Sequence, residues 1–136
     1  DYQLVFDQPE DADTLLLSPR GLLRPGEAEP MLQGGRIALE YETFRRLDTL
    51  IFQGLRSTRV SLRHRETGRG VSLDFRQFPM VAFWTKPGAP FLCMEPWQGC
   101  AALENESGRF RDKPHVLTLA PGEKKELAYA FTLPDN

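Results

Sequence analysis

The chain has 136 residues, of which 40% are hydrophobic and 26% are charged, and its formal net charge at pH 7 is −2. This size and composition are typical of one globular domain with a hydrophobic core. Seventeen Lys and Arg residues against nineteen Asp and Glu residues give no excess of positive charge, which argues against a nucleic-acid partner. No apolar run approaches the ~18 residues that a membrane-spanning helix needs, so no membrane partner is expected.

Alternation of apolar and polar residues with a period of two predicts β-strands along most of the chain. Only Glu40–Leu47, about two turns long, has helical spacing. Pro-Gly and Gly-Gly pairs separate the predicted elements, as turn chemistry requires. In chain order, the predicted strands are 2–6, 14–17, 36–39, 49–52, 59–65, 71–75, 80–85, 90–95, 115–119 and 126–133. Many short strands with one short helix indicate an all-β fold, an antiparallel β-sandwich or barrel.

Two predicted hairpins use the last strands of this series. The first joins strands 59–65 and 71–75 through the Gly-containing turn ETGRG, and the second joins strands 115–119 and 126–133 through APGEKK. Between strand 90–95 and the second hairpin lies a long polar segment, Gln98–Pro114. We expect this segment to be a loop that forms a wall or lid of a site.

Glu95 is the first candidate for chemistry, because it stands between the apolar run PFLCM and the pair Pro96-Trp97. Apolar neighbours disfavour a charged carboxylate, and this is how a Glu becomes a base that acts near neutral pH. The alternative is a strand-end Glu that pairs with an Arg or points to water. Trp84 and Trp97 either stack on a sugar ring or fill the core, and Asp48 either caps a turn or accepts hydrogen bonds from sugar hydroxyls.

Other kinds of site find little support in the sequence. His64 and His115 are each interpreted as ordinary surface or strand-end residues, and no Ser-His-Asp or Cys-His pattern is present. Cys93 and Cys100 lack metal-ligand spacing, so neither a metal site nor a cofactor is expected. Two free thiols in a reducing compartment are the preferred interpretation, with a disulfide as the alternative, and this favours a cytoplasmic location.

The stretch FWTKPGAPFLCMEPWQG (83–99) is similar to a motif of a known protein family. Together with the loop ending in DKP and the closing TLAPGE, it resembles the aldose 1-epimerases, or galactose mutarotase-like proteins, and especially their LacX-like branch. The opening DYQLVF, SPRGLLRPGE, DTLIFQGLRS and GRGVSLDF carry the resemblance across essentially the whole chain. The match is to the C-terminal half of a family member, so we expect residues 1–136 to be one domain that is half of a larger one.

The resemblance implies a large antiparallel β-sandwich, the galactose mutarotase-like supersandwich, that interconverts the α and β anomers of a monosaccharide. It implies that Glu95 acts as a base on the C1 hydroxyl and that Asp48 binds the sugar. It also implies that the catalytic histidine, a substrate-binding histidine and a sugar-binding arginine come from sequence upstream of Asp1, in a missing N-terminal half. A sugar-binding glutamine of the galactose-specific branch falls at Ala82 in this chain.

Two alternatives to an epimerase remain open at this point. One is a carbohydrate-binding β-sandwich without turnover, because a fold does not by itself determine a function. The other is a hexose-6-phosphate 1-epimerase, which needs a cluster of Arg or Lys residues at the mouth of the site, for which Lys86 and Arg109 are candidates. We also expect the chain to need the missing half, because half of a sandwich leaves strand edges and an apolar face uncovered.

Overall fold

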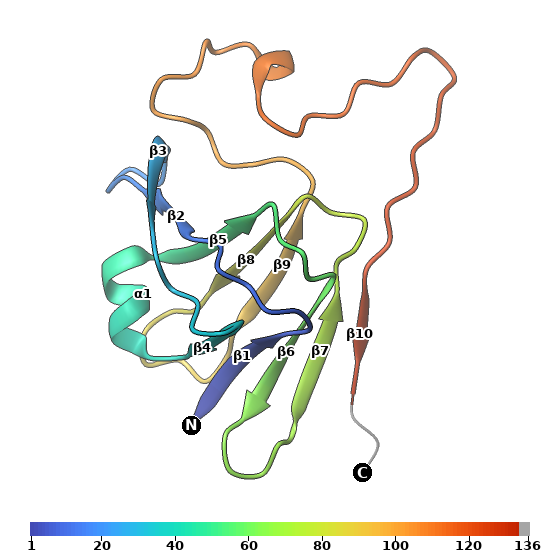
Figure 1. Cartoon of the computed structure of the whole chain (residues 1–136). Helices are drawn as coiled ribbons and strands as arrows, with labels where there is room; N and C mark the ends of the chain where they lie inside the picture. The colour runs from blue at the N-terminus through green and yellow to red at the C-terminus, as the bar shows by residue number, and fades with distance from the viewer. Residues whose placement is uncertain (134–136) are drawn as a thin grey trace.

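A computed structural model describes residues 1–133 of the chain. These residues form ten β-strands, one α-helix and a short 3-10 helix (Figure 1). In chain order, the elements are β1 (Tyr2–Phe6), β2 (Thr14–Leu17), β3 (Leu23–Glu29), β4 (Arg36–Ala38), α1 (Tyr41–Leu47), β5 (Thr49–Gln53), β6 (Arg59–His64), β7 (Gly70–Asp74), β8 (Met80–Trp84), β9 (Cys93–Trp97), η1 (Phe110–Asp112) and β10 (Ala130–Thr132). Within residues 1–133, no helix has the length and apolar character needed to cross a membrane.

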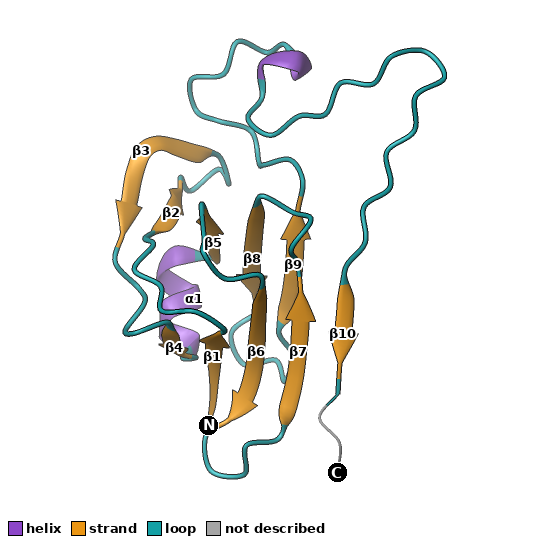
Figure 2. Ribbon diagram, turned by 45° about the vertical axis from the view of Figure 1, so that its right-hand side comes forward, coloured by secondary structure: helices purple, strands orange, loops and turns teal. Residues whose placement is uncertain are grey.

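The strands form three antiparallel sheets (Figure 2). A five-stranded sheet has the order β10-β7-β6-β1-β4, a three-stranded sheet has the order β5-β8-β9, and β2 pairs with β3 in a two-stranded ribbon. The five-stranded and three-stranded sheets pack face to face, and α1 lies beside β5. The predicted all-β antiparallel sandwich with one short helix is therefore confirmed.

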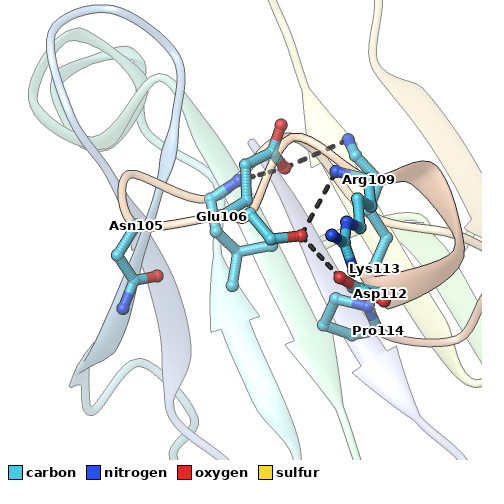
Figure 3. Close-up of a pocket in the computed structure, with 8 residues that line it drawn as sticks. Asn105, Glu106, Arg109, Asp112, Lys113 and Pro114 are labelled. Atoms are coloured by element: carbon cyan, nitrogen blue, oxygen red, sulfur yellow. Dashed lines mark hydrogen bonds and ion pairs between the residues drawn. The ribbon is translucent and has the colours of Figure 1, made fainter.

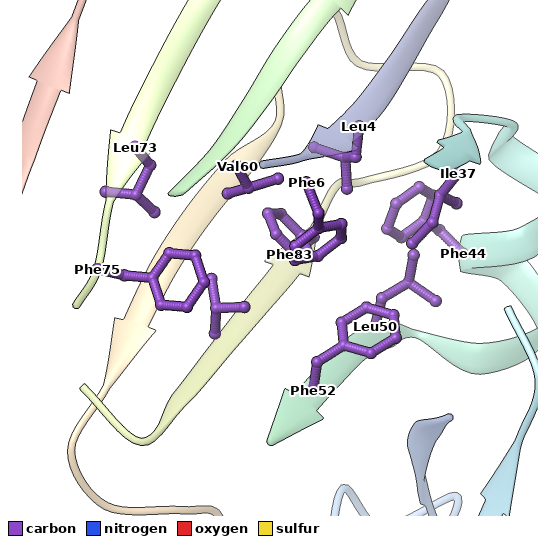
Figure 4. Close-up of a cluster of buried hydrophobic side chains, with 11 residues drawn as sticks. Leu4, Phe6, Ile37, Phe44, Leu50, Phe52, Val60, Leu73, Phe75 and Phe83 are labelled. Atoms are coloured by element: carbon purple, nitrogen blue, oxygen red, sulfur yellow. The ribbon is translucent and has the colours of Figure 1, made fainter. Parts of the chain in front are cut away.

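The sandwich core fills the space between the two larger sheets (Figure 4). Alternate residues of β5 and β8 point into it, including Leu50, Phe52 and Phe83, and none of these is exposed. Phe6 of the opposite sheet meets the rings of Phe52 and Phe83 edge-on, with ring centroids 5.9 and 6.2 Å apart. The buried residues of this core cluster are Leu4, Phe6, Ile37, Phe44, Leu50, Phe52, Val60, Leu73, Phe75, Val81 and Phe83.

Most predicted elements occur where the period-two pattern places them. The hairpin of β6 and β7 has the predicted arrangement, with Arg63 opposite Gly70 and Val60 opposite Leu73. The predicted strands 2–6 and 14–17 match β1 and β2 residue for residue. Residues 98–114, which follow β9, are a loop as predicted, except for the short helix η1 within them.

The second predicted hairpin is wrong. The turn between its arms does form, because Glu123 N–H donates to the carbonyl of Ala120 at 2.9 Å. Residues 115–119, however, are not a strand, and the last strand, β10, pairs with β7, where Phe131 lies opposite Leu73. The alternating apolar pattern therefore gave the conformation of β10 but not its partner.

Two further differences concern β3 and β9. β3 was not predicted, because Pro25 and Gly26 in its sequence indicate a turn, and Gly26 does take a positive φ of 77°. β9 begins at Cys93, three residues later than the predicted strand 90–95, and it continues to Trp97. Pro96 is tolerated within it because β9 is an edge strand, where a residue without an N–H group need not break the sheet.

Candidate functional site

Strand β9 presents Glu95 on the face of the three-stranded sheet that points away from the sandwich core. Side chains alternate along a strand, so Met94 packs against the core while Cys93, Glu95 and Trp97 share the other face. All three are half-buried. We call this surface of β5, β8 and β9 the outer face.

The carboxylate of Glu95 has a defined partner on this face. The indole Nε1–H of Trp97 donates a hydrogen bond to Oε2 of Glu95 at 2.9 Å. Residues two apart on a strand lie on the same face, so the spacing Glu-Pro-Trp itself makes this contact possible. A hydrogen bond to a charged acceptor is stronger than one between neutral groups. The bond fixes one oxygen of the carboxylate and leaves the other, Oε1, for a ligand.

The floor beside Glu95 is apolar. Ala82 of β8 lies directly opposite Glu95, and Ile51 of β5 lies opposite Ala82. These two belong to a buried cluster with Leu23 and Met80, which we call the outer-face cluster. The hairpin of β2 and β3 covers part of it, and the hydroxyl of Thr14 accepts a hydrogen bond from Ile51 N–H at 2.9 Å. Ala82 thus contributes no polar group where the resemblance places a glutamine.

Trp84 lies on the same outer face, next to Cys93 across the strand pair. Its ring packs against Phe91 with centroids 5.7 Å apart and an angle of 49° between the planes. Phe91 is 47% exposed, and Trp84 is half-buried. Trp84 and Phe91 therefore form a partly accessible aromatic surface near one end of β9, while Trp97 contacts Glu95 directly near the other end.

Asp48 does not lie next to Glu95. It caps the C-terminus of α1 with a positive φ of 63°, is exposed, and accepts a hydrogen bond from the hydroxyl of Thr49 at 2.7 Å. Asp48 lies three residues before Ile51, and Ile51 is two strands away from Glu95 in the register. Strand geometry therefore places Asp48 and Glu95 roughly 14 Å apart. The capping interpretation therefore describes its contacts among the described residues, and Thr49, its hydrogen-bond donor, has its side chain on the outer face.

The two histidines differ in their surroundings. His64 packs edge-on against Tyr2 of the five-stranded sheet and accepts a hydrogen bond from Thr67 N–H, so it stabilises a turn. His115, by contrast, lies beside the outer face, with Nε2 3.2 Å from Oε1 of Gln53 in β5. Its carbonyl accepts a hydrogen bond from the side-chain amide of Gln98 at 2.8 Å. No local sequence pattern indicates this placement, because 62 residues separate His115 from Gln53.

Both cysteines are free, as predicted. Cys100 packs against the outer-face cluster, and burial raises the pKa of its thiol above the ordinary value. Among residues 1–133, no group of three His, Cys, Asp or Glu side chains is placed to hold a metal ion.

A cavity of about 220 Å³ is formed within the loop 103–114 (Figure 3). Its polar groups bind one another: Glu106 pairs with Lys113 at 3.5 Å and accepts from Leu103 N–H, and Ser107 contacts Asp112 at 2.6 Å. These contacts hold the loop in shape, which explains them without a ligand.

Comparison with known proteins adds a second line of evidence. No protein-family model matches the chain. The chromosomal and plasmid forms of protein LacX from Lactococcus lactis subsp. lactis are each 32% identical over 136 residues, which is 98% of this chain and 45% of each relative. A solved galactose mutarotase related enzyme from Lactobacillus acidophilus has a TM-score of 0.86 at 24% identity, and a galactose mutarotase-like protein from Lactobacillus casei has 0.86 at 22%.

The chain has a galactose mutarotase-like fold. Both solved structures superpose on 98% of it, so the predicted resemblance to LacX-like and galactose mutarotase-like proteins is confirmed. The chain spans about half the length of the relatives it matches, since 45–47% of each relative is covered. Within this galactose mutarotase-like fold, the motif Glu95-Pro96-Trp97 forms the end of β9 and faces away from the sandwich core.

Proposed function

We propose that the protein is an aldose 1-epimerase-like isomerase in which Glu95 is the catalytic base. The observation that supports this most directly is the bond from Trp97 Nε1–H to Glu95, which holds a half-buried carboxylate in one orientation beside an apolar floor. A base works best when it is fixed within hydrogen-bond reach of the proton that it removes.

The proposed reaction is a pair of proton transfers. Oε1 of Glu95 takes the proton of the C1 hydroxyl while the ring oxygen receives a proton from an acid, so that the bond from C1 to the ring oxygen breaks and an open-chain aldehyde forms. Rotation about the bond from C1 to C2 exposes the other face of the carbonyl. Reclosure then returns the first proton from Glu95 to the carbonyl oxygen and the second to the acid, so the enzyme is unchanged.

The acid, and some of the groups that recognise the sugar, belong in this proposal to sequence beyond this chain. Asp48 lies too far from Glu95 to contact the same atom of a sugar ring, so we assign it to the far side of the ligand. Trp84 with Phe91 offers an aromatic surface on which the C–H face of a sugar packs. Neither metal nor organic cofactor enters the proposed chemistry, which consists of proton transfer alone.

A carbohydrate-binding protein without turnover is the second candidate, and the Trp84–Phe91 surface also favours it. The hexose 6-phosphate alternative has less support. Lys86 follows β8, whereas Arg109 belongs to the loop that leaves the opposite end of the paired strand β9, so these cations do not form the cluster that a phosphate requires (Figure 1).

A polarimetric measurement of the mutarotation rate of freshly dissolved α-D-galactose or α-D-glucose separates these candidates. The proposal predicts a rate that is proportional to protein concentration and that Glu95→Gln abolishes. A binding protein without turnover leaves the spontaneous rate unchanged while still retaining the sugar in equilibrium dialysis.

A further inference from the structure

A cavity of about 120 Å³ adjoins the outer face next to Trp97. Its floor is Met80, which lies directly between Trp97 of β9 and Gln53 of β5 in the strand register. Met80 is therefore about 4.8 Å from Trp97 and roughly 8 Å from Glu95 by strand geometry. Apolar side chains from the β2–β3 hairpin and the loop after β9 form the walls, namely Leu15, Leu23 and Leu103.

Three polar side chains reach this cavity from separate parts of the sequence. His115 and Gln53 lie side by side at its rim, 3.2 Å apart. Arg24 of β3 lines the other side, and its Nε, which is buried and lies 4.0 Å from Oε2 of Glu104, makes no hydrogen bond among the described residues. Because this Nε has no exposed surface, the polar groups open to a ligand here are the exposed side chains of His115 and Gln53.

The position of His115 is imposed by its surroundings. Its φ is +60°, in the left-handed region that side-chain-bearing residues rarely adopt. Amide groups hold it from two sides, through its ring (Gln53) and through its carbonyl (Gln98). Such conformations persist where the structure around them fixes them, and they concentrate at ligand-binding sites.

Charge decides what kind of ligand fits. The guanidinium of Arg24 is paired with Glu27 at 2.8 Å and lies 4.0 Å from Glu104, so two carboxylates accompany one cation. An anion such as a phosphate is repelled by this surplus of negative charge, whereas a neutral hydroxyl binds beside these groups without a charge penalty. Mostly apolar walls with a few convergent polar groups are typical of sites for small neutral molecules.

We propose that this cavity is a subsite for a neutral, hydroxyl-bearing part of the sugar, remote from the anomeric carbon at Glu95. His115 and Gln53 bind a hydroxyl of the sugar at the rim, and the apolar walls pack against its C–H groups. This inference rests on the proposed function for the position of the anomeric carbon. It also predicts that the protein discriminates against sugars that carry a phosphate at this end.

The test uses ¹⁵N-labelled protein purified with any polypeptide that accompanies it, titrated with D-galactose and separately with D-galactose 6-phosphate. The subsite predicts that the neutral sugar shifts the side-chain amide signal of Gln53 and the ring signals of His115 together with the indole signal of Trp97. The phosphorylated sugar is expected to bind more weakly. A shift of the Trp97 signal alone, or tighter binding of the phosphate, overturns the subsite.

Binding measurements on variants test the subsite independently of the proposed isomerase activity. His115→Asn removes the ring but keeps a residue type that tolerates a positive φ, and we expect it to weaken galactose binding about fivefold, as loss of one hydrogen bond does. His64→Asn, on the other sheet, is the matched control and should bind normally. Equal affinity of both variants overturns the subsite even if mutarotation is observed. If no mutarotation is observed but His115→Asn alone loses affinity for galactose, the proposed function is overturned and the subsite is supported.

Discussion

Replacement of Trp97 by Phe separates two roles for this side chain. Trp97 was predicted to bind substrate by stacking, but its indole N–H donates to Glu95 at 2.9 Å. Trp97→Phe keeps an aromatic face and removes only this donor. If Trp97 positions the base, the variant lowers kcat; if it only stacks on the sugar, the variant leaves kcat unchanged.

The size of the effect follows from the bond itself. Hydrogen bonds to charged groups contribute about 1.5–3 kcal/mol, and because both partners are half-buried rather than fully buried, we take the lower end. About 1.5 kcal/mol corresponds to a roughly tenfold fall in kcat. KM should change less than kcat, because the ring that faces the ligand is retained.

Polarimetric initial rates over a range of sugar concentrations give kcat and KM for the wild type, Trp97→Phe and Trp84→Phe. Trp84→Phe is the control, since the Trp84 ring packs against Phe91, whereas the hydrogen bond to Glu95 comes from Trp97. We expect it to retain kcat within about twofold, as a ring-for-ring exchange usually does. A Trp97→Phe variant with unchanged kcat and a raised KM would refute the positioning role.

Three further predictions concern stability. Phe83→Ala should lower the free energy of unfolding by about 3–5 kcal/mol in urea titrations, because Phe83 is fully buried between Phe6 and Phe52. The hydrogen bond from Arg76 lowers the pKa of Asp74. The stabilisation of the folded state by this carboxylate is therefore present above the ordinary Asp pKa of about 4 and is lost as the pH falls through the lower folded pKa. Asp74→Asn should flatten this part of the plot of unfolding free energy against pH, and an unchanged plot would argue against the pair. The isolated 136-residue chain should aggregate, since Phe110, Phe131 and Leu133 are more than half exposed; a monomer in sedimentation with cooperative unfolding would contradict this.

How far the sequence predicts the fold depends on whether local pattern or a distant partner decides each element. β6 and β7 alternate regularly and are joined by a short turn, so both their conformation and their pairing follow from local sequence. β10 also alternates, but it pairs with β7, more than 50 residues earlier, rather than across the turn next to it. No local signal in residues 115–133 distinguishes these two partners.

The candidate site also combines contacts that follow from local sequence with contacts that depend on distant partners. The contact between Glu95 and Trp97 is local, because two residues on one strand face share a surface, and the sequence indicated both as site residues. Asp48 was expected at the ligand, but its distance from Glu95 depends on the register of β5, β8 and β9. His115 was interpreted as an ordinary strand-end residue, although a contact with Gln53 across 62 residues holds it beside the outer face.

The most direct test of the central claim, that Glu95 is the base of an anomer-exchange reaction, is a comparison of wild type and Glu95→Gln by ¹H NMR. Magnetisation transfer between the α and β anomeric protons of galactose at equilibrium measures exchange without any coupling enzyme. If Glu95 is the base, exchange depends on protein in the wild type and falls by at least about a hundredfold in Glu95→Gln, as removal of a general base commonly causes. Exchange that Glu95→Gln retains in full would contradict the assignment of the base.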